Sequence, residues 1–159
     1  MESLRIDGFI QLAINDDPER VISFAPDDIM FAERFYGLLD AFREKENEYR
    51  ERAGKLSENK KLDDYGIPET APDGIALLRD VCDFMRDEID IVFGEGTSEK
   101  AFGDVRSLDM IEQFFKGITP YIQHARHEKT RRYTDPVIEK RRQIEQEKAQ
   151  KQPLPQSHK

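Results

Sequence analysis

The sequence has one cysteine, no tryptophan and no long apolar run. The single Cys82 excludes an internal disulfide and a cysteine-based zinc site, and it favours a reducing compartment. No apolar stretch approaches the roughly 18 residues that cross a bilayer, and the N-terminus lacks a basic start followed by an apolar run. We therefore expect a soluble cytoplasmic protein without a membrane partner.

Ten phenylalanines and five tyrosines supply the apolar area for one compact core. Charge is unevenly distributed along the chain. Residues 1–120 contain 15 Lys and Arg against 28 Asp and Glu, a net charge of −13, whereas residues 121–159 contain 10 against 5, a net charge of +5. The acidic body should repel nucleic acid. The basic tail keeps open one alternative function, a nucleic-acid-associated regulator that acts through its tail.

The pattern predicts a mainly α fold, in which three main helices form a small bundle with an N-terminal β-hairpin. Apolar residues from Leu4 to Ile14, a turn at Asn15–Pro18 and a return strand from Arg20 to Phe24 predict the hairpin. The charged C-terminal end is expected to be partly disordered. The expected domains are the hairpin packed on the helices (1–26), a helical core (27–133) and a charged helix or tail (134–159).

Apolar spacing predicts the first two helices. The first opens at Pro26-Asp27-Asp28 and runs to about Leu56. Its apolar stripe consists of Phe31, Phe35, Leu38, Leu39 and Phe42. The second runs from about Asp73 to Phe93, with Gly94 as its C-cap. Its seam has a period of 3.5 and consists of Ile75, Leu78, Cys82, Met85, Ile89 and Val92.

A glycine-flanked connector, GEGTSEKAFG, leads to the third helix. We expect Thr97 or Ser98 to cap a short helical turn within it, and Ser107 to cap the third helix. The apolar face of that helix consists of Ile111, Phe114, Phe115, Ile118, Ile122 and Ala125. Pro120 predicts a kink near Gly117. The periodicity fades from Arg126, and Asp135-Pro136 is a place where a helix can restart.

Two acidic stripes suggest a second alternative, a Mg²⁺-dependent all-α hydrolase of nucleotides. They are Glu44, Glu48 and Glu51 on the first helix, and Asp80, Asp83 and Asp87 on the second. A solvated acidic flank, neutralised by nearby Lys45, Arg50 and Arg52, is the favoured interpretation. We therefore assign no catalytic, cofactor-binding or metal-binding residue, and we expect a binding protein that uses no cofactor and is not an enzyme.

Three stretches together resemble a known family: VISFAPDDIMFAERFYGLL (21–39), GIALLRDVCDFMRDEIDIVFGEGTSEKAFGD (74–104) and LDMIEQFFKGITPYIQHAR (108–126). They resemble small proteins of siphophages and prophages of Gram-positive bacteria, which are encoded between the tail-tube and tape-measure genes. Such proteins are generally regarded as tail assembly chaperones. The resemblance covers roughly residues 20–133.

The resemblance implies a chaperone in the host cell cytoplasm that binds the tape-measure protein, the tail-tube protein or both during tail morphogenesis. It supplies no catalytic residue. Self-association into a homo-oligomer, and pairing of the hairpin within or between chains, both remain open. As partner-binding residues we select aromatics of the connector and the third helix: Phe93, Phe102, Phe114, Phe115 and Tyr121.

Overall fold

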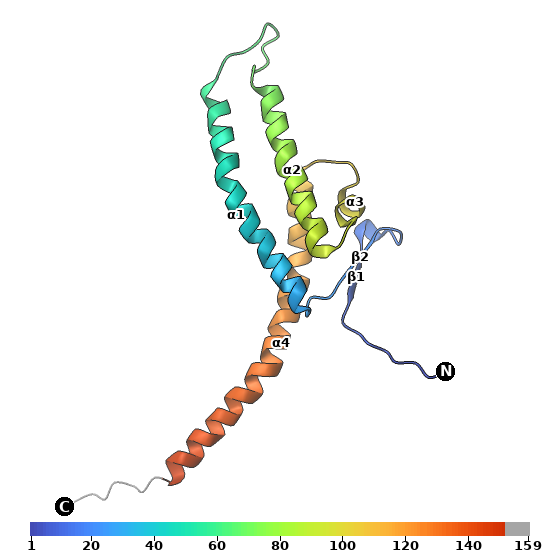
Figure 1. Cartoon of the computed structure of the whole chain (residues 1–159), viewed down its shortest axis with the longest axis vertical. Helices are drawn as coiled ribbons and strands as arrows, with labels where there is room; N and C mark the ends of the chain where they lie inside the picture. Colours follow the sequence, from blue (N-terminus) through green and yellow to red (C-terminus); the bar gives the residue numbers. More distant parts are fainter. Residues whose placement is uncertain (152–159) are drawn as a thin grey trace, which may run out of the picture. The chain divides into compact units, whose positions relative to one another are not determined.

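A computed structural model describes the backbone of residues 1–151 and the side chains of residues 1–123 and 139–149. It confirms a mainly helical fold with an N-terminal antiparallel hairpin (Figure 1). The elements in chain order are β1 (Ile10–Ala13), η1 (Ile14–Asp16), β2 (Val21–Phe24), α1 (Ile29–Glu58), α2 (Ala71–Phe93), α3 (Thr97–Phe102) and α4 (Leu108–Lys151). The chain forms two compact units, Met1–Pro120 and Tyr121–Lys159.

The hairpin is shorter than the sequence predicts. β1 pairs with β2 from Ile10 opposite Phe24 to Ala13 opposite Val21. A strand that starts at Leu4 is therefore wrong for this chain, because its partner strand ends at Phe24 and the chain then turns toward α1. The residues before Ile10 extend past the end of the ladder without a partner strand in the described chain.

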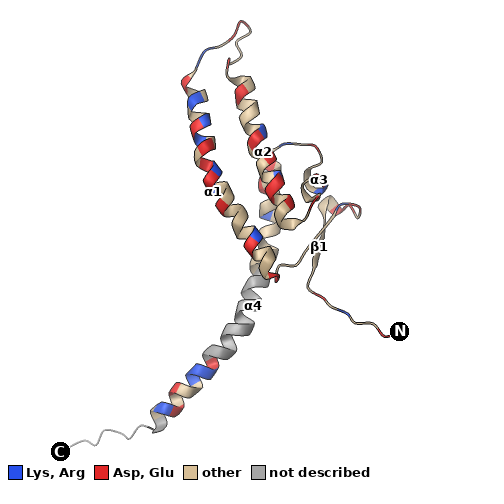
Figure 2. Cartoon of the chain, in the orientation of Figure 1, with Lys and Arg blue, Asp and Glu red and all other residues tan. Residues whose placement is uncertain are grey.

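α1 begins where the acidic turn predicts. The carboxylate of Asp28 accepts a hydrogen bond of 2.9 Å from the amide of Met30, which satisfies one of the free donors at the helix start. Phe31 and Leu38 of its stripe are buried, whereas Leu39 lies exposed at the edge. The second half of α1 is rich in charged residues of both signs (Figure 2). Its charges form pairs along the helix, such as Glu51 with Lys55.

α2 runs back along α1 (Figure 1). Part of its predicted seam is buried, namely Cys82, Met85, Ile89 and Val92. The prediction is wrong for Ile75 and Leu78, which are exposed. Near its N-terminus, α2 packs against α1 through a different face. On this face Leu77 is buried, and Phe84 packs edge-on against Tyr49 of α1 at 6.4 Å.

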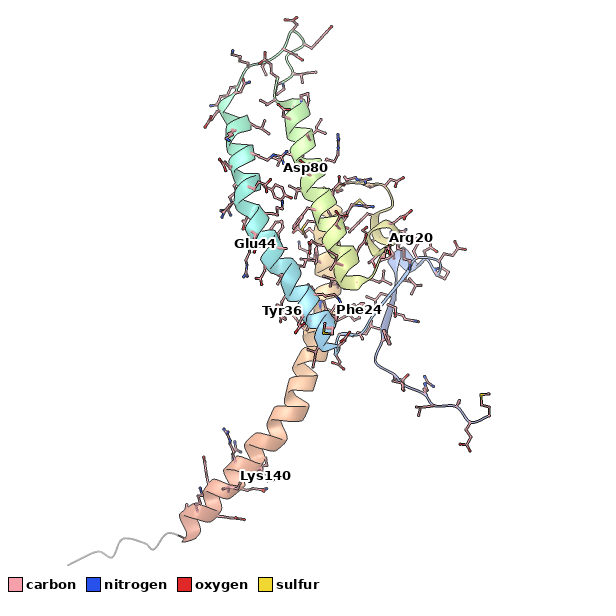
Figure 3. The ribbon with its side chains drawn as sticks, in the orientation of Figure 1. Arg20, Phe24, Tyr36, Glu44, Asp80 and Lys140 are labelled. Carbon is pink, nitrogen blue, oxygen red and sulfur yellow. The ribbon has the colours of Figure 1, made fainter. Side chains whose placement is uncertain are left out.

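Phenylalanines join the elements of the first unit into one core. Phe24 of the hairpin, labelled in Figure 3, stacks on Phe31 of α1 at 5.4 Å and meets Phe93 of α2 edge-on at 5.5 Å. Phe93 in turn meets Phe114 of α4 at 5.3 Å, and Phe102 of α3 meets Phe114 at 5.7 Å. Edge-to-face contacts at these separations are favourable beyond the area they bury. The core therefore positions the hairpin, α3 and the start of α4 around the end of α2.

α4 is longer than predicted. Ser107 caps it as expected, since its hydroxyl accepts a hydrogen bond of 3.2 Å from the amide of Met110. The helix restart expected at Asp135-Pro136 is wrong, because the backbone continues as one helix from Leu108 to Lys151. Glu, Lys, Arg and Gln make up most of residues 137–151. These residues have high helix propensity, which favours a helix even without an apolar stripe. The kink near Gly117 stays a prediction, and the disordered end predicted at 152–159 lies outside the described residues.

No helix within the described residues is long and apolar enough to cross a membrane.

Candidate functional site

The connector between α2 and α4 has a defined backbone conformation that specific hydrogen bonds hold in place. Gly94, Gly96 and Gly103 have φ angles of 113°, 88° and 58°, values that side chains with a Cβ rarely adopt. The expected cap by Thr97 or Ser98 is wrong, because Gly96 is the N-cap and both residues lie inside the first turn of α3. The hydroxyl of Thr97 instead donates to the carbonyl of Gly94 at 2.7 Å.

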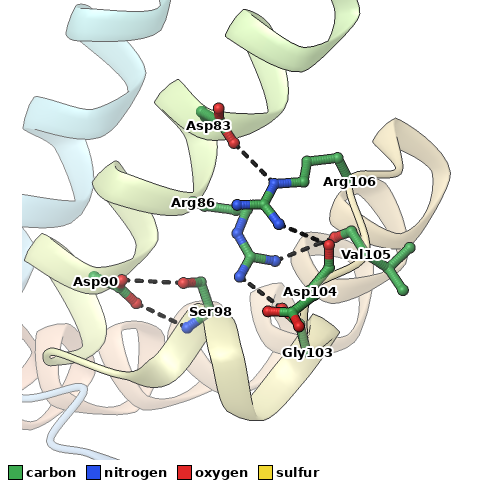
Figure 4. Close-up of polar contacts among 8 residues, drawn as sticks. All are labelled: Asp83, Arg86, Asp90, Ser98, Gly103, Asp104, Val105 and Arg106. Carbon is green, nitrogen blue, oxygen red and sulfur yellow. Dashed lines mark hydrogen bonds and ion pairs between the residues drawn. The ribbon is translucent and has the colours of Figure 1, made fainter.

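A carboxylate from α2 takes the place of a side-chain cap on α3. Asp90 accepts the amide of Ser98 at 2.8 Å and the hydroxyl of Ser98 at 3.0 Å (Figure 4). A negative charge at the start of a helix is favourable, since the free amides there carry partial positive charge. The pair therefore fixes the start of α3 against the last turn of α2.

Arg86 of α2 holds the chain that leaves α3. This residue is 9% exposed, and its guanidinium donates to the carbonyls of Gly103 at 2.7 Å and Val105 at 3.2 Å (Figure 4). The same group lies 5.8 Å from the ring centre of Phe102. A planar guanidinium suits this position because it can donate two hydrogen bonds in a fixed fork and stack on a ring.

A second arginine, from the hairpin, caps the end of α3 itself. Figure 3 shows Arg20 where the hairpin meets α3. Arg20 donates to the carbonyls of Lys100 at 2.7 Å and Ala101 at 3.1 Å, which are among the free acceptors at the helix end. Sequence reasoning missed both arginines. The signal for Arg86 was a charged residue directly after Met85 of the apolar seam.

An open hollow of about 540 Å³ lies beside α3, with Asp83, Asp87 and Asp90 of α2 in its lining. Arg86 and Arg106 also line it, and the Nε of Arg106 lies 3.0 Å from the Oδ1 of Asp83. The hollow thus combines carboxylates with two guanidinium groups. Arg106 pairs with Asp83, Arg86 donates to backbone carbonyls, and Asp90 accepts from Ser98. These polar groups therefore hold the connector in place.

The two acidic stripes of the magnesium hypothesis do not converge. Asp83 and Asp87 line the hollow beside α3, whereas Asp80 pairs with Arg52 of α1 at 2.9 Å. On α1 itself, Glu48 pairs with Lys45 at 3.3 Å. Within the described residues, no group of three or more His, Cys, Asp or Glu side chains is placed to hold a metal ion.

Cys82 behaves as a core residue. It is buried and unpaired, and burial, with a smaller contribution from the carboxylate of Asp83, raises the pKa of its thiol. A raised pKa lowers the fraction of the reactive thiolate at neutral pH. The place of Cys82 in the predicted apolar seam is confirmed by its burial.

The five aromatics selected as partner-binding residues fall into two groups. Phe93, Phe102 and Phe114 are buried in the core, and Phe115 is half-buried with its ring 5.6 Å from that of Phe114. Tyr121 on α4 is exposed. Contact between these five residues and a partner stays a prediction, but burial gives the first three a structural role in the described chain.

A second loop that hydrogen bonds order, residues 59–70, joins α1 to α2 at the end of the helix pair farthest from the hairpin (Figure 1). The carboxylate of Asp63 accepts the amides of Tyr65 and Ile67, each at 2.9 Å. The amide of Asp63 donates to the carbonyl of Ile67 at 2.7 Å, and the amide of Glu69 donates to the carbonyl of Lys61 at 3.0 Å. Side-chain acceptance by Asp is a standard way to order a turn.

This end of the helix pair exposes large apolar side chains. We call them the distal surface: Leu62, Tyr65, Ile67, Ile75 and Leu78. Tyr65 is the most exposed of them, at 89%. Sequence analysis predicts no helix or strand between about Leu56 and Asp73, and it missed this exposed apolar area, although three apolar residues stand there among Pro and Gly. The distal surface offers apolar area on an ordered backbone.

Residues 20–152 match the model of a family of unknown function, DUF6673. The chain belongs to this family. No curated protein and no solved structure matches the chain. The DUF6673 match starts at Arg20, so it includes the arginine that caps α3 and the whole distal surface, and it leaves out the first residues of the chain.

Proposed function

We propose that this DUF6673 chain is an assembly chaperone of phage tails. It binds the tape-measure protein, the tail-tube protein or both in the host cell cytoplasm during virion assembly. The distal surface is the observation that carries the proposal, and the sequence resemblance names the partners. The proposal gives the chain a binding role and assigns it no catalytic residue.

The distal surface has the properties of a protein-binding site. Several exposed apolar side chains at one end of a helix pair are typical of a contact with a partner. Transfer of each side chain out of water lowers the free energy. Asp63 already orders the backbone that carries Tyr65 and Ile67. Binding therefore costs little conformational entropy, which favours affinity.

The chemistry of the surface indicates the class of partner. Ile75 and Leu78 lie three residues apart on α2, so they form a short stripe along a helix that another apolar helix face can meet. A tape-measure protein is a long helical chain with apolar faces that must stay in solution before assembly. The net charge of −13 over residues 1–120 keeps such a complex from aggregating.

The test is co-expression of the tagged chain with the tape-measure and tail-tube proteins of the same genome. We expect at least one of them to co-purify, and the tape-measure protein to move from the pellet to the supernatant. Ile75→Lys combined with Leu78→Lys should lower the affinity at least about tenfold, because two charges would enter an apolar contact.

Ile91→Lys is the matched control, since Ile91 is an equally exposed isoleucine on the same helix, outside the distal surface. This variant should bind like the parent chain. Failure of the parent chain to bind either partner would contradict the proposed function. Equal loss of binding in Ile91→Lys and in the distal variant would contradict the assignment of the surface.

A further inference from the structure

A segment with the pattern of a β-strand precedes β1 and pairs with no strand in the described chain. Leu4 and Ile6 alternate with Arg5 and Asp7. In an extended chain, consecutive side chains point to opposite faces. The two apolar side chains therefore share one face, and the two charged side chains share the other. The Nε of Arg5 lies 3.3 Å from the Oδ1 of Asp7, which places both charges on one side. Ile6 is 82% exposed.

β1 offers a free edge in line with this segment. The sheet of the described chain consists of β1 and β2, so β1 has backbone donors and acceptors along its other edge. Residues 4–9 lie beyond the end of β2 and have neither edge covered. An edge that carries apolar side chains and open backbone groups is a template for another strand.

We propose that this segment pairs antiparallel with the same segment of a second copy of the chain, about a two-fold axis at Ile6. In this register Arg5 of each copy lies opposite Asp7 of the other, and the two Ile6 side chains meet. Leu4 lies opposite Gly8, where the missing side chain leaves room. Such a contact is self-complementary, as a two-fold interface requires.

Charge selects this register over its neighbours. With the axis at Arg5, two guanidinium groups would face each other, and with the axis at Asp7, two carboxylates would do so. Like charges directly opposite each other destabilise a strand pair, and opposite charges stabilise it. Registers displaced by a single residue would place Arg5 opposite Ile6, or Asp7 opposite Ile6. The Ile6 axis pairs opposite charges with each other and apolar residues with apolar residues or glycine.

A charge swap in the full-length chain tests the register. Sedimentation velocity over a range of concentrations should show a reversible dimer for the parent chain. Arg5→Asp alone and Asp7→Arg alone should each weaken self-association roughly tenfold, because each creates two like-charge pairs across the axis. The double variant Arg5→Asp/Asp7→Arg restores opposite charges and should associate like the parent chain.

Cysteine cross-linking gives an independent readout. Ile6→Cys places two thiols opposite each other, at a strand separation that a disulfide can bridge, so mild oxidation should yield a covalent dimer. Leu4→Cys is the matched control, because its symmetry mate lies on the other side of the axis. The parent chain controls for Cys82, which is buried.

A parent chain that stays monomeric at every concentration would overturn the proposal. So would a double charge variant that associates as weakly as the single variants, or equal cross-linking at Leu4→Cys and Ile6→Cys. These results are independent of partner binding, because the distal surface lies on another part of the chain.

Discussion

Arg20 and Lys100, eighty residues apart, each donate to the backbone of the other's element. The Nε of Arg20 donates to the carbonyl of Lys100 at 2.7 Å, and the ammonium of Lys100 donates to the carbonyl of Val21 at 3.2 Å. The hairpin is thereby fixed to the end of α3. A lone two-stranded hairpin is marginally stable in water, so this contact and the ring of Phe24 explain why it is ordered.

Arg20→Ala should destabilise the chain by about 1–3 kcal/mol, because the carbonyls of Lys100 and Ala101 lose their donors. Urea denaturation measures the change. Arg20→Lys should recover only part of the loss, since one ammonium cannot reproduce the fork of the guanidinium. Full recovery in Arg20→Lys would show that charge, and not the fork, holds the hairpin.

Arg86→Met should cost more, about 2–4 kcal/mol in urea denaturation, because it leaves the partly buried carbonyls of Gly103 and Val105 without their charged donor. Methionine keeps much of the volume, so lost packing contributes little. Arg106→Met is the control. Its side chain is exposed and its pair with Asp83 is solvated, so its loss should cost at most about 1 kcal/mol. Equal costs for the two variants would contradict the anchoring role of Arg86.

Features that depend on neighbours along the chain were predictable from the sequence. Ser107 caps α4 because its hydroxyl meets an amide three residues ahead, and Gly94 ends α2 because its backbone can take a positive φ. The buried part of the α2 seam from Cys82 to Val92 followed from apolar spacing. Each of these depends on a residue and its immediate surroundings.

Features that depend on distant partners were not predictable in the same way. β1 begins only at Ile10 because β2 ends at Phe24, which alternation in the first strand does not reveal. The function of Arg20 as the cap of α3 requires contact across eighty residues. Ile75 is exposed because α1 packs against another face of α2 at this end of the helix pair. An apolar stripe of period 3.5 does not indicate how far along α2 another helix covers the stripe.

Ile89→Ala and Ile91→Ala test which face of α2 is inside. Ile89 is 0% exposed and Ile91 is 59% exposed, although the two lie on the same turn. Ile89→Ala should cost about 2–5 kcal/mol, through lost burial and a remaining cavity, and Ile91→Ala should cost less than about 1 kcal/mol. Thermal or urea unfolding of both variants provides the comparison. Similar losses would mean that α2 is rotated relative to the structure described above.

Glu88 should make the stability of the chain depend on pH. Burial, with a smaller contribution from the carboxylate of Asp87, raises the pKa of Glu88 above that of a free glutamate. In the pH range between the unfolded value of about 4.3 and the raised folded value, the folded chain binds more protons than the unfolded chain. This group's contribution therefore destabilises the fold as the pH rises through that range.

Glu88→Gln removes the penalty, so this variant should be more stable than the parent chain at pH 7. The difference should disappear below about pH 4, where glutamate is protonated in both states. Urea denaturation at pH 7 and at pH 3.5 measures it. Glu95→Gln removes the same charge from an exposed position and corrects for the change in net charge. A Glu88→Gln variant that is no more stable than Glu95→Gln at pH 7 would show that the half-buried carboxylate of Glu88 carries no penalty.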